Sequence, residues 1–167
     1  MKDILNQIVD NKRFEVDLQK MNITSRQIEE LAFDPRSFHS MRQSIMSSKS
    51  GVIAEFKRKS PSKGWIHADV NAVEVAKAYS ANKASAISVL TDSSFFGGSL
   101  KDLRSIREVT DTPLLRKDFI IDEYQLFQAR IAGADAVLLI AACLKQDLCR
   151  QLAEKAHELG LEVLLEI

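Results

Sequence analysis

The feature that most restricts the fold of this chain is a repeated alternation of short apolar runs with helix-forming stretches. Five such runs are centred near Ile53, Ile87, Leu115, Val137 and Val163, at intervals of 22 to 34 residues. Each interval has room for one helix and its connections, which is what a crossover between parallel strands needs. The pattern predicts consecutive βα units and a parallel sheet. It fits both a doubly wound sheet and a (βα)8 barrel, and periodicity alone does not separate these two architectures.

Cap and stop residues give the expected boundaries. The predicted strands cover 52–56, 86–90, 113–117, 136–140 and 161–167, and the helices between them cover 70–81, about 99–110, 122–132 and 146–159. Asp69, Ser99 and Asp122 are suitable N-cap residues, and Gly133 and Gly160 suit the position after a helix. These elements define a predicted partial barrel over 51–167.

A helical extension is predicted over residues 1–50. Helices are expected at 3–20, 25–31 and 37–48, with a break at Asp34-Pro35. In the first of them, apolar residues recur at helical spacing. The polar residues between, Lys12 among them, are expected to stay solvated.

Composition excludes several classes of function. The 167 residues suit one domain, and 23 basic residues balance 23 acidic ones. A net charge of zero argues against a general nucleic-acid or membrane-surface partner. No run reaches the length of a membrane span, the N-terminus is too polar for a signal peptide, and the two cysteines form no paired motif, so a soluble cytoplasmic protein is expected. The histidines show no metal-ligand spacing, and no metal or organic cofactor is expected.

Charged residues occur where predicted strands end. Glu55 and Lys57 are two residues apart and therefore share one face of a strand, and Pro61 follows soon after. Lys117 and Glu166 end two later strands. Each alone fits a solvated strand end, but in a barrel all four would converge on one mouth. Two acids and two lysines there could move protons and hold an anion.

Five motifs carry a family resemblance. They lie at 55–62 (Glu-Phe-Lys-Arg-Lys-Ser-Pro-Ser), 87–91, 96–99, 115–119 and 134–139. Their residues and order resemble the indole-3-glycerol phosphate synthase family. The resemblance implies a (βα)8 TIM barrel of the α/β class whose N-terminal extension packs over the barrel mouth. It also implies ring closure and decarboxylation of 1-(2-carboxyphenylamino)-1-deoxyribulose 5-phosphate, an anthranilate-derived sugar phosphate, in tryptophan biosynthesis.

The resemblance also suggests site residues. Lys117 matches the family's general acid, Glu166 the acid/base glutamate, and Glu55 the glutamate that orients the lysine. The remaining matches are expected to bind substrate: Lys57 its anionic groups, Ser60 its phosphate, and Phe96 and Phe119 its anthranilate ring. The division of acid and base roles among the lysines and glutamates stays open. Without the resemblance, Ser60 equally fits a turn before proline, and each phenylalanine fits a core position.

The number of strands leads to a further expectation. A barrel of this type has eight strands and typically about 250 residues. We expect a chain truncated after strand five, without the family's phosphate-binding loops after later strands, and with little or no activity. Its open interior and edge strands could pair with a second copy. The alternative is a non-catalytic half-barrel that serves as an assembly module; another phosphosugar barrel, such as an isomerase, fits the motifs less well.

Overall fold

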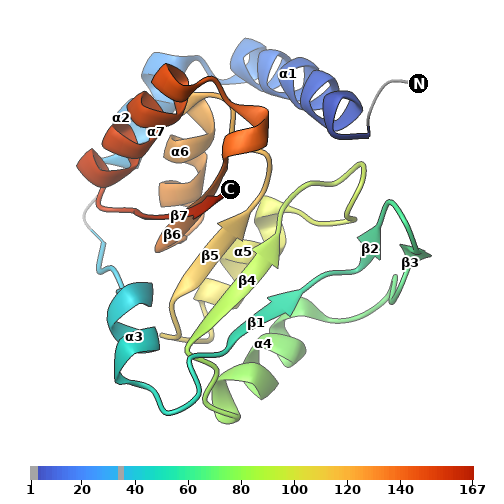
Figure 1. Cartoon of the computed structure of the whole chain (residues 1–167), viewed down its shortest axis with the longest axis vertical. Helices are drawn as coiled ribbons and strands as arrows, with labels where there is room; N and C mark the ends of the chain where they lie inside the picture. Colours follow the sequence, from blue (N-terminus) through green and yellow to red (C-terminus); the bar gives the residue numbers. More distant parts are fainter. Residues whose placement is uncertain (1–3, 34–35) are drawn as a thin grey trace.

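The computed structural model describes residues 4–33 and 36–167, which form one five-stranded parallel sheet with helices around it (Figure 1). The strands of this sheet are β1 (Ile53–Phe56), β4 (Ala86–Leu90), β5 (Leu114–Lys117), β6 (Ala136–Ile140) and β7 (Glu162–Glu166). The helices are α1 (Ile4–Asn22), α2 (Ser25–Ala32), α3 (Met41–Ser47), α4 (Ala72–Ala81), α5 (Leu100–Arg107), α6 (Glu123–Ile131) and α7 (Gln146–Glu158), with a 3-10 turn η1 (Ala141–Cys143). Within the described ranges, no helix is long and apolar enough to cross a membrane.

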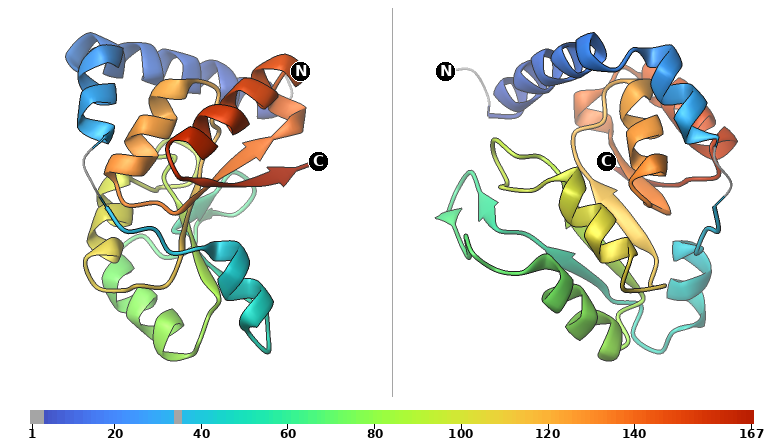
Figure 2. Two further views of the ribbon diagram at one scale, coloured as in Figure 1. Left: turned by 90° about the vertical axis from the view of Figure 1, so that its left-hand side faces the viewer. Right: turned by 180° about the vertical axis from the view of Figure 1, so that it is seen from behind.

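Strand order decides between the two architectures that the periodicity left open. The strands are neighbours in chain order, β1-β4-β5-β6-β7, and every pair is parallel. The crossover helices lie together on one face of the sheet (Figure 2). A doubly wound sheet reverses its strand order and carries helices on both faces. The described residues therefore form five consecutive strands of a (βα) barrel, and the predicted fold class is confirmed.

The core lies between the sheet and these helices. Outward-facing strand residues such as Val89 and Val137 are fully buried, as are Leu103 of α5 and Leu126 of α6. Side chains on the opposite face line a cavity of about 370 Å³. One of them, Leu164 of β7, keeps 37% of its surface exposed. The two faces thus differ: one is a packed core and the other is an open concave surface.

The N-terminal helices reach both ends of the sheet. In Figure 1, α1 lies beyond the carboxyl ends of the strands and α3 lies at their amino ends. Met41 and Ile45 of α3 pack against Ala86, Leu115 and Ala136. The extension was expected over the carboxyl-terminal mouth, and α1 occupies that place. The position of α3 at the opposite end was not predicted.

Most predicted elements agree with the structure to within two residues. The strands at 86–90 and 136–140 have the predicted bounds, and Thr24, Ser99 and Asp122 cap the helices that follow them. Gly133 and Gly160 adopt positive φ values of 91° and 75°, which favour glycine. The predicted break at residues 34–35 lies outside the described residues.

Two predictions of local structure were wrong, and one small element was missed. The helix expected over 37–48 begins only at Met41, because Ser40 accepts a hydrogen bond from Gln43 N and caps it. Asn71, and not Asp69, caps α4. Its side chain accepts hydrogen bonds from Val73 N and Glu74 N. The loop after β1 contains a small antiparallel hairpin, β2 (Lys59–Ser60) and β3 (Gly64–Trp65), which the sequence did not predict.

Candidate active site

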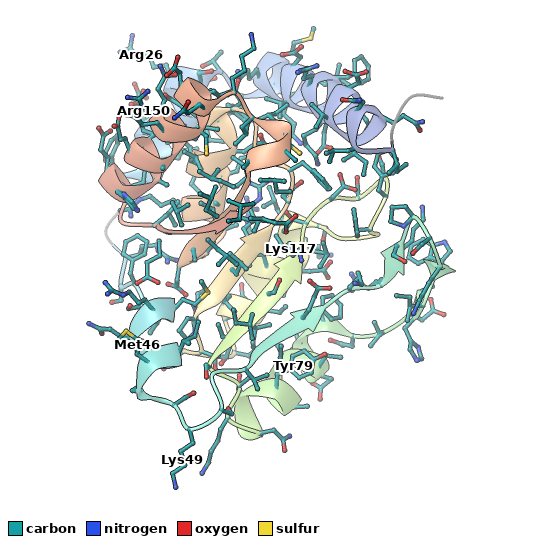
Figure 3. The ribbon with its side chains drawn as sticks, viewed as in Figure 1. Arg26, Met46, Lys49, Tyr79, Lys117 and Arg150 are labelled. Atoms are coloured by element: carbon teal, nitrogen blue, oxygen red, sulfur yellow. The ribbon has the colours of Figure 1, made fainter. Side chains whose placement is uncertain are left out.

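A glutamate between two lysines forms the centre of the candidate site. Glu55 of β1 accepts a hydrogen bond from Lys57 Nζ to Oε1 at 2.8 Å, and Lys117 Nζ lies 3.1 Å from Oε2. The register places Glu55 opposite Ser88 of β4, and Lys117 ends β5, the next strand along. Parallel pairing therefore brings together side chains that are 62 positions apart in the chain. Figure 3 shows Lys117 near the carboxyl end of its strand.

The electrostatics keep this glutamate ionised. Partial burial of Glu55 opposes its negative charge, but the hydrogen bonds and charges of Lys57 and Lys117 outweigh that effect. The pKa of Glu55 is therefore lower than its ordinary value. The side chains of all three residues keep about a third of their surface exposed, so a ligand can reach them. The group presents two ammonium donors that are held by a single carboxylate.

An apolar cavity adjoins the charged group. It has a volume of about 330 Å³, and Lys117 and Glu166 line it together with Phe96 and Phe119. The two phenyl rings are tilted at 34°, with centroids 6.0 Å apart. Glu166, at the end of β7, also lines the larger cavity on the concave face beside Lys117. The cavity therefore joins a wall suited to an aromatic ring with groups that can exchange protons.

Ser60 does not line either cavity. Its Oγ accepts a hydrogen bond from Lys63 N at 3.2 Å, which is the geometry of a turn. Gly97 and Gly98 also serve loop geometry. Gly97 has a φ of 64°, and a Cβ on Gly98 would lie 2.1 Å from the carbonyl oxygen of Leu90.

Sequence reasoning missed several residues at the site. Ser88 lines the concave cavity, and its buried Oγ has no hydrogen-bond partner among the described residues. Leu5 of α1 lines the aromatic cavity. Arg58 donates to both carboxylate oxygens of Asp102, at 2.6 and 2.9 Å, and so fixes the segment that follows Lys57. Arg58 and Ser88 lie within motifs at 55–62 and 87–91, which is a signal in the sequence; the place of Leu5 depends on tertiary packing.

Comparisons with known proteins identify the family. The family model described as indole-3-glycerol phosphate synthase matches residues 5–167. A relative from Bacteroides thetaiotaomicron with that name is 62% identical over 167 residues, covering 100% of this chain and 64% of the relative. Relatives of the same name from Neisseria meningitidis serogroup B and Desulfosudis oleivorans are 47% and 42% identical, each covering 100% of this chain and 66% and 65% of their own lengths.

The chain spans slightly less than two thirds of the length of these curated relatives. The family match nevertheless extends over all five strands of the sheet and over the residues at their carboxyl ends. The chain belongs to the indole-3-glycerol phosphate synthase family.

Proposed function

We propose that this chain supplies acid/base and substrate-binding groups for the synthesis of indole-3-glycerol phosphate from 1-(2-carboxyphenylamino)-1-deoxyribulose 5-phosphate. The observation that carries the proposal is the bridge from Lys57 through Glu55 to Lys117 beside a cavity lined by two phenyl rings. An ammonium group held on a carboxylate is a positioned proton donor. A cavity with aromatic walls suits a planar ring.

The proposed reaction begins with proton transfer to the substrate carbonyl. Lys117 gives a proton to the carbonyl oxygen while the carboxyl-bearing ring carbon attacks the carbonyl carbon and forms the new C–C bond. Carbon dioxide then leaves, and the electron pair of the broken bond restores the aromatic ring. Loss of the hydroxyl as water takes a second proton, and removal of one proton from the adjacent carbon completes the indole. The net change consumes one proton and releases carbon dioxide and water.

The other residues have binding and acid/base roles in this proposal. Glu55 orients Lys117, Lys57 binds the anionic groups of the substrate, and Glu166 shares the later proton transfers. Phe96 and Phe119 form the wall against which the anthranilate ring is held. Ser60 contacts the phosphate once the loop after β1 closes on it, which requires its turn hydrogen bond to adjust.

We infer that the 167 residues alone turn over slowly or not at all. The supporting observation is the open concave face, where Glu166 and Leu164 are exposed. An exposed carboxylate and ammonium are solvated by water, which weakens their action on a bound substrate.

A protein with this biosynthetic role would act in the cytoplasm.

Turnover is tested by indole fluorescence with the purified chain. The same assay is repeated with the chain fused to the part of the Bacteroides relative that lies outside the matched region. We expect turnover with the fusion, and a loss of at least about 100-fold in kcat for Lys117→Met. Lys77→Met, which removes an exposed lysine paired with Glu74 on an outer helix, is the matched control and should retain full activity. A fusion that folds but has no activity would overturn the proposed function.

Self-association is the second candidate function. Val52 beside the β1 edge is 51% exposed, and Leu164 and Leu165 on β7 are 37% and 50% exposed. An open parallel sheet with apolar residues at its edges is a template for pairing with another chain. Sedimentation velocity of the chain alone should detect a dimer. Leu165→Lys should return it to a monomer, and a monomer at all concentrations would exclude this function.

A further inference from the structure

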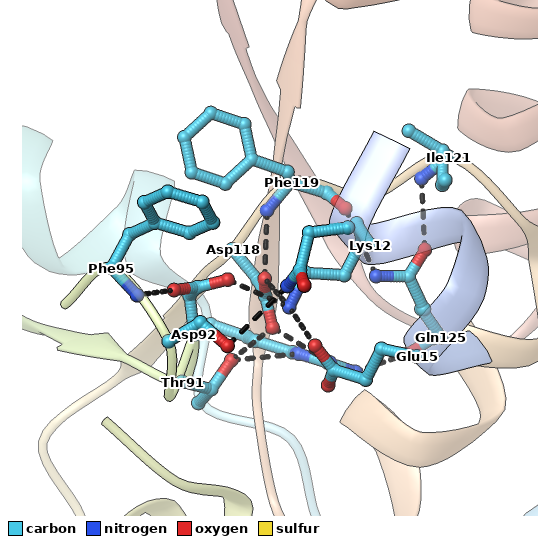
Figure 4. A network of polar contacts seen from close by, with 12 residues as sticks. Lys12, Glu15, Thr91, Asp92, Phe95, Asp118, Phe119, Ile121 and Gln125 are labelled. Carbon is cyan, nitrogen blue, oxygen red and sulfur yellow. Dashed lines mark hydrogen bonds and ion pairs between the residues drawn. The ribbon is translucent and has the colours of Figure 1, made fainter. Parts of the chain in front are cut away.

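A buried lysine on the N-terminal helix points into the carboxyl end of the sheet. Lys12 of α1 is 1% exposed, although it was predicted to be solvated; that prediction was wrong. Its Nζ lies 2.8 Å from Glu15 Oε2, 2.9 Å from Asp92 Oδ2 and 3.0 Å from Asp118 Oδ1 (Figure 4). The ammonium group donates a hydrogen bond to Glu15, and both aspartates lie within ion-pair distance of it.

The two aspartates come from different strand ends. Asp92 follows β4, and its Oδ1 accepts a hydrogen bond from Phe95 N at 2.8 Å. Asp118 follows β5, and its Oδ1 accepts from Phe119 N, also at 2.8 Å. Lys12 therefore joins two loops that each use their aspartate to fix the backbone N–H of a phenylalanine.

Asp118 is the more constrained of the two aspartates. Its Oδ2 accepts from Thr91 Oγ1 at 2.6 Å and from Arg116 Nη2 at 2.9 Å. Burial alone would raise the pKa of Asp118, but the charges of Arg116 and Lys12 and the hydrogen bond from Thr91 hold that pKa far below its usual range. For Lys12 the signs are reversed. Burial alone would lower its pKa, but its carboxylate partners, Asp118 foremost, raise that pKa above the usual value. Lys12 and Asp118 are thus both charged at neutral pH.

Asp118 stands directly between two residues of the candidate site. Lys117 precedes it and reaches Glu55, and Phe119 follows it and lies beside Phe96 in the cavity wall. Because Asp118 Oδ1 accepts a hydrogen bond from Phe119 N, a displacement of this carboxylate acts directly on the backbone between the two neighbours. A misplacement of about 1 Å in a catalytic group can reduce a rate by about 100-fold.

The cluster could in principle serve stability alone. A buried ion pair, however, is weak evidence for stabilisation, because apolar residues of similar volume often stabilise as well or better. What charged groups add is a defined geometry, because a buried charge is stabilised only where its partners lie. Asp118 has such partners at the strand ends that carry the candidate site: Thr91, Arg116, Phe119 N and Lys12.

We propose that Lys12 is a positioning residue, which holds Asp92 and Asp118 in fixed places and thereby sets the positions of Lys117 and Phe119 in the candidate active site. This inference rests on the proposed function for its kinetic consequence. Its structural consequence does not depend on turnover. Through Lys12, the amino-terminal helix then influences the chemistry, although Lys12 itself does not contact the substrate.

The test compares two lysines of the same helix. Lys12→Met removes the ammonium from the cluster, and Lys12→Arg keeps a cation there. Lys20→Met is the matched control, since Lys20 also forms an interhelical ion pair, 2.6 Å to Asp122, at the start of α6 and away from both cavities. Melting temperature, kcat and KM are measured on the active fusion, at a temperature where circular dichroism shows every variant to be native.

We expect Lys12→Met to lower kcat/KM by about 10- to 100-fold in folded protein, with partial recovery in Lys12→Arg. Lys20→Met should lower the melting temperature but leave kcat and KM within about two-fold of the parent. If Lys12→Met does not fold, the double variant with Asp92→Asn replaces it, because the amide oxygen still accepts from Phe95 N and one buried charge is removed. Equal kinetics for folded Lys12 and Lys20 variants would overturn the proposal.

A crystal structure of the 167-residue Lys12 variant, or of the double variant, separates this inference from the proposed function. We expect the contact between Lys117 Nζ and Glu55 Oε2, now 3.1 Å, to lengthen or break, and the spacing of the phenyl rings to change. Unchanged positions of Lys117 and Phe119 would refute the positioning role even if the enzyme were active. Altered positions in the variant, together with a parent fusion that folds but does not turn over, would support positioning and reject the proposed reaction.

Discussion

Asp135 offers the sharpest test of how this sheet is held together at its amino-terminal end. The side chain is 1% exposed, and each of its oxygens accepts from one guanidinium and one backbone N–H. Oδ1 accepts from Arg36 Nη2 at 2.9 Å and from His39 N at 3.0 Å. Oδ2 accepts from Arg107 Nη1 at 2.7 Å and from Leu114 N at 2.9 Å. One carboxylate thus joins the segment before α3, helix α5 and strand β5.

Asp135→Asn should therefore be strongly destabilising despite its small change in shape. Whichever way the amide lies, its NH2 group faces one guanidinium and one backbone N–H, which are donors and not acceptors. Removing one partner of a buried ion pair costs about 3–5 kcal/mol. Because Arg36 and Arg107 keep 18% and 16% of their side chains exposed, we expect the lower end, about 3 kcal/mol. That corresponds to a fall in Tm of roughly 6–12 °C for a chain of this size.

Urea unfolding followed by circular dichroism measures this loss. The matched control is Asp111→Asn, whose carboxylate is 97% exposed and lies 3.7 Å from His39 Nε2; it should change the unfolding free energy by no more than about 0.5 kcal/mol. An Asp135→Asn variant within about 1 kcal/mol of the parent would refute the reasoning, because the donors would then have found other partners. In the active fusion, kcat should be unchanged, since Asp135 lies at the end of the sheet opposite Lys117.

Three further predictions concern the carboxyl-terminal end. Because the pKa of Asp118 is depressed on folding, its stabilising effect is complete above about pH 4 and is lost as the pH falls further. In urea unfolding between pH 3 and 7, the unfolding free energy of Asp118→Asn should therefore fall less steeply with decreasing pH than that of the parent. Glu55→Gln should lower kcat of the fusion by about 100-fold, because the lysines lose their shared counter-charge, and should leave the melting temperature nearly unchanged. Gly98→Ala should lower the unfolding free energy, measured in urea, by about 2–3 kcal/mol, because the new Cβ meets the Leu90 carbonyl. Gly64→Ala has free space for its Cβ and should lower it by only about 1–2 kcal/mol, because of the positive φ at this position.

The sequence predicted the strands well because their pattern depends on burial. β4 and β6 are buried at every position, so each appears as an uninterrupted apolar run with clear ends. The predicted strand ends also indicated which charged residues would lie close together. In the structure, Glu55 contacts both Lys57 and Lys117. The roles of these residues in a reaction stay predictions.

The failures have a common physical cause, which is competition between equally suitable local signals. Asp69 and Asn71 are both good N-cap residues, and only the course of the preceding loop selects the second. Lys12 has the helical position and character of a solvated lysine. Its burial requires Asp92 and Asp118, which arrive from strand ends about 80 and 106 positions later. Local periodicity contains no information about such partners.

The contacts of the N-terminal helices suggest why one segment reaches both ends of the sheet. At the amino ends, Ser40 of the α3 cap donates to Glu162 at the start of β7, and Ser44 donates to the Ser85 carbonyl before β4. At the carboxyl ends, Lys12 joins the loops after β4 and β5. In barrels of this class, residues at the amino-terminal face contribute stability and those at the carboxyl-terminal face contribute function. Substitutions in α3 should therefore change unfolding alone, whereas those at the Lys12 cluster should change unfolding and turnover together; the same segment then couples the stability of the sheet to the geometry of its site.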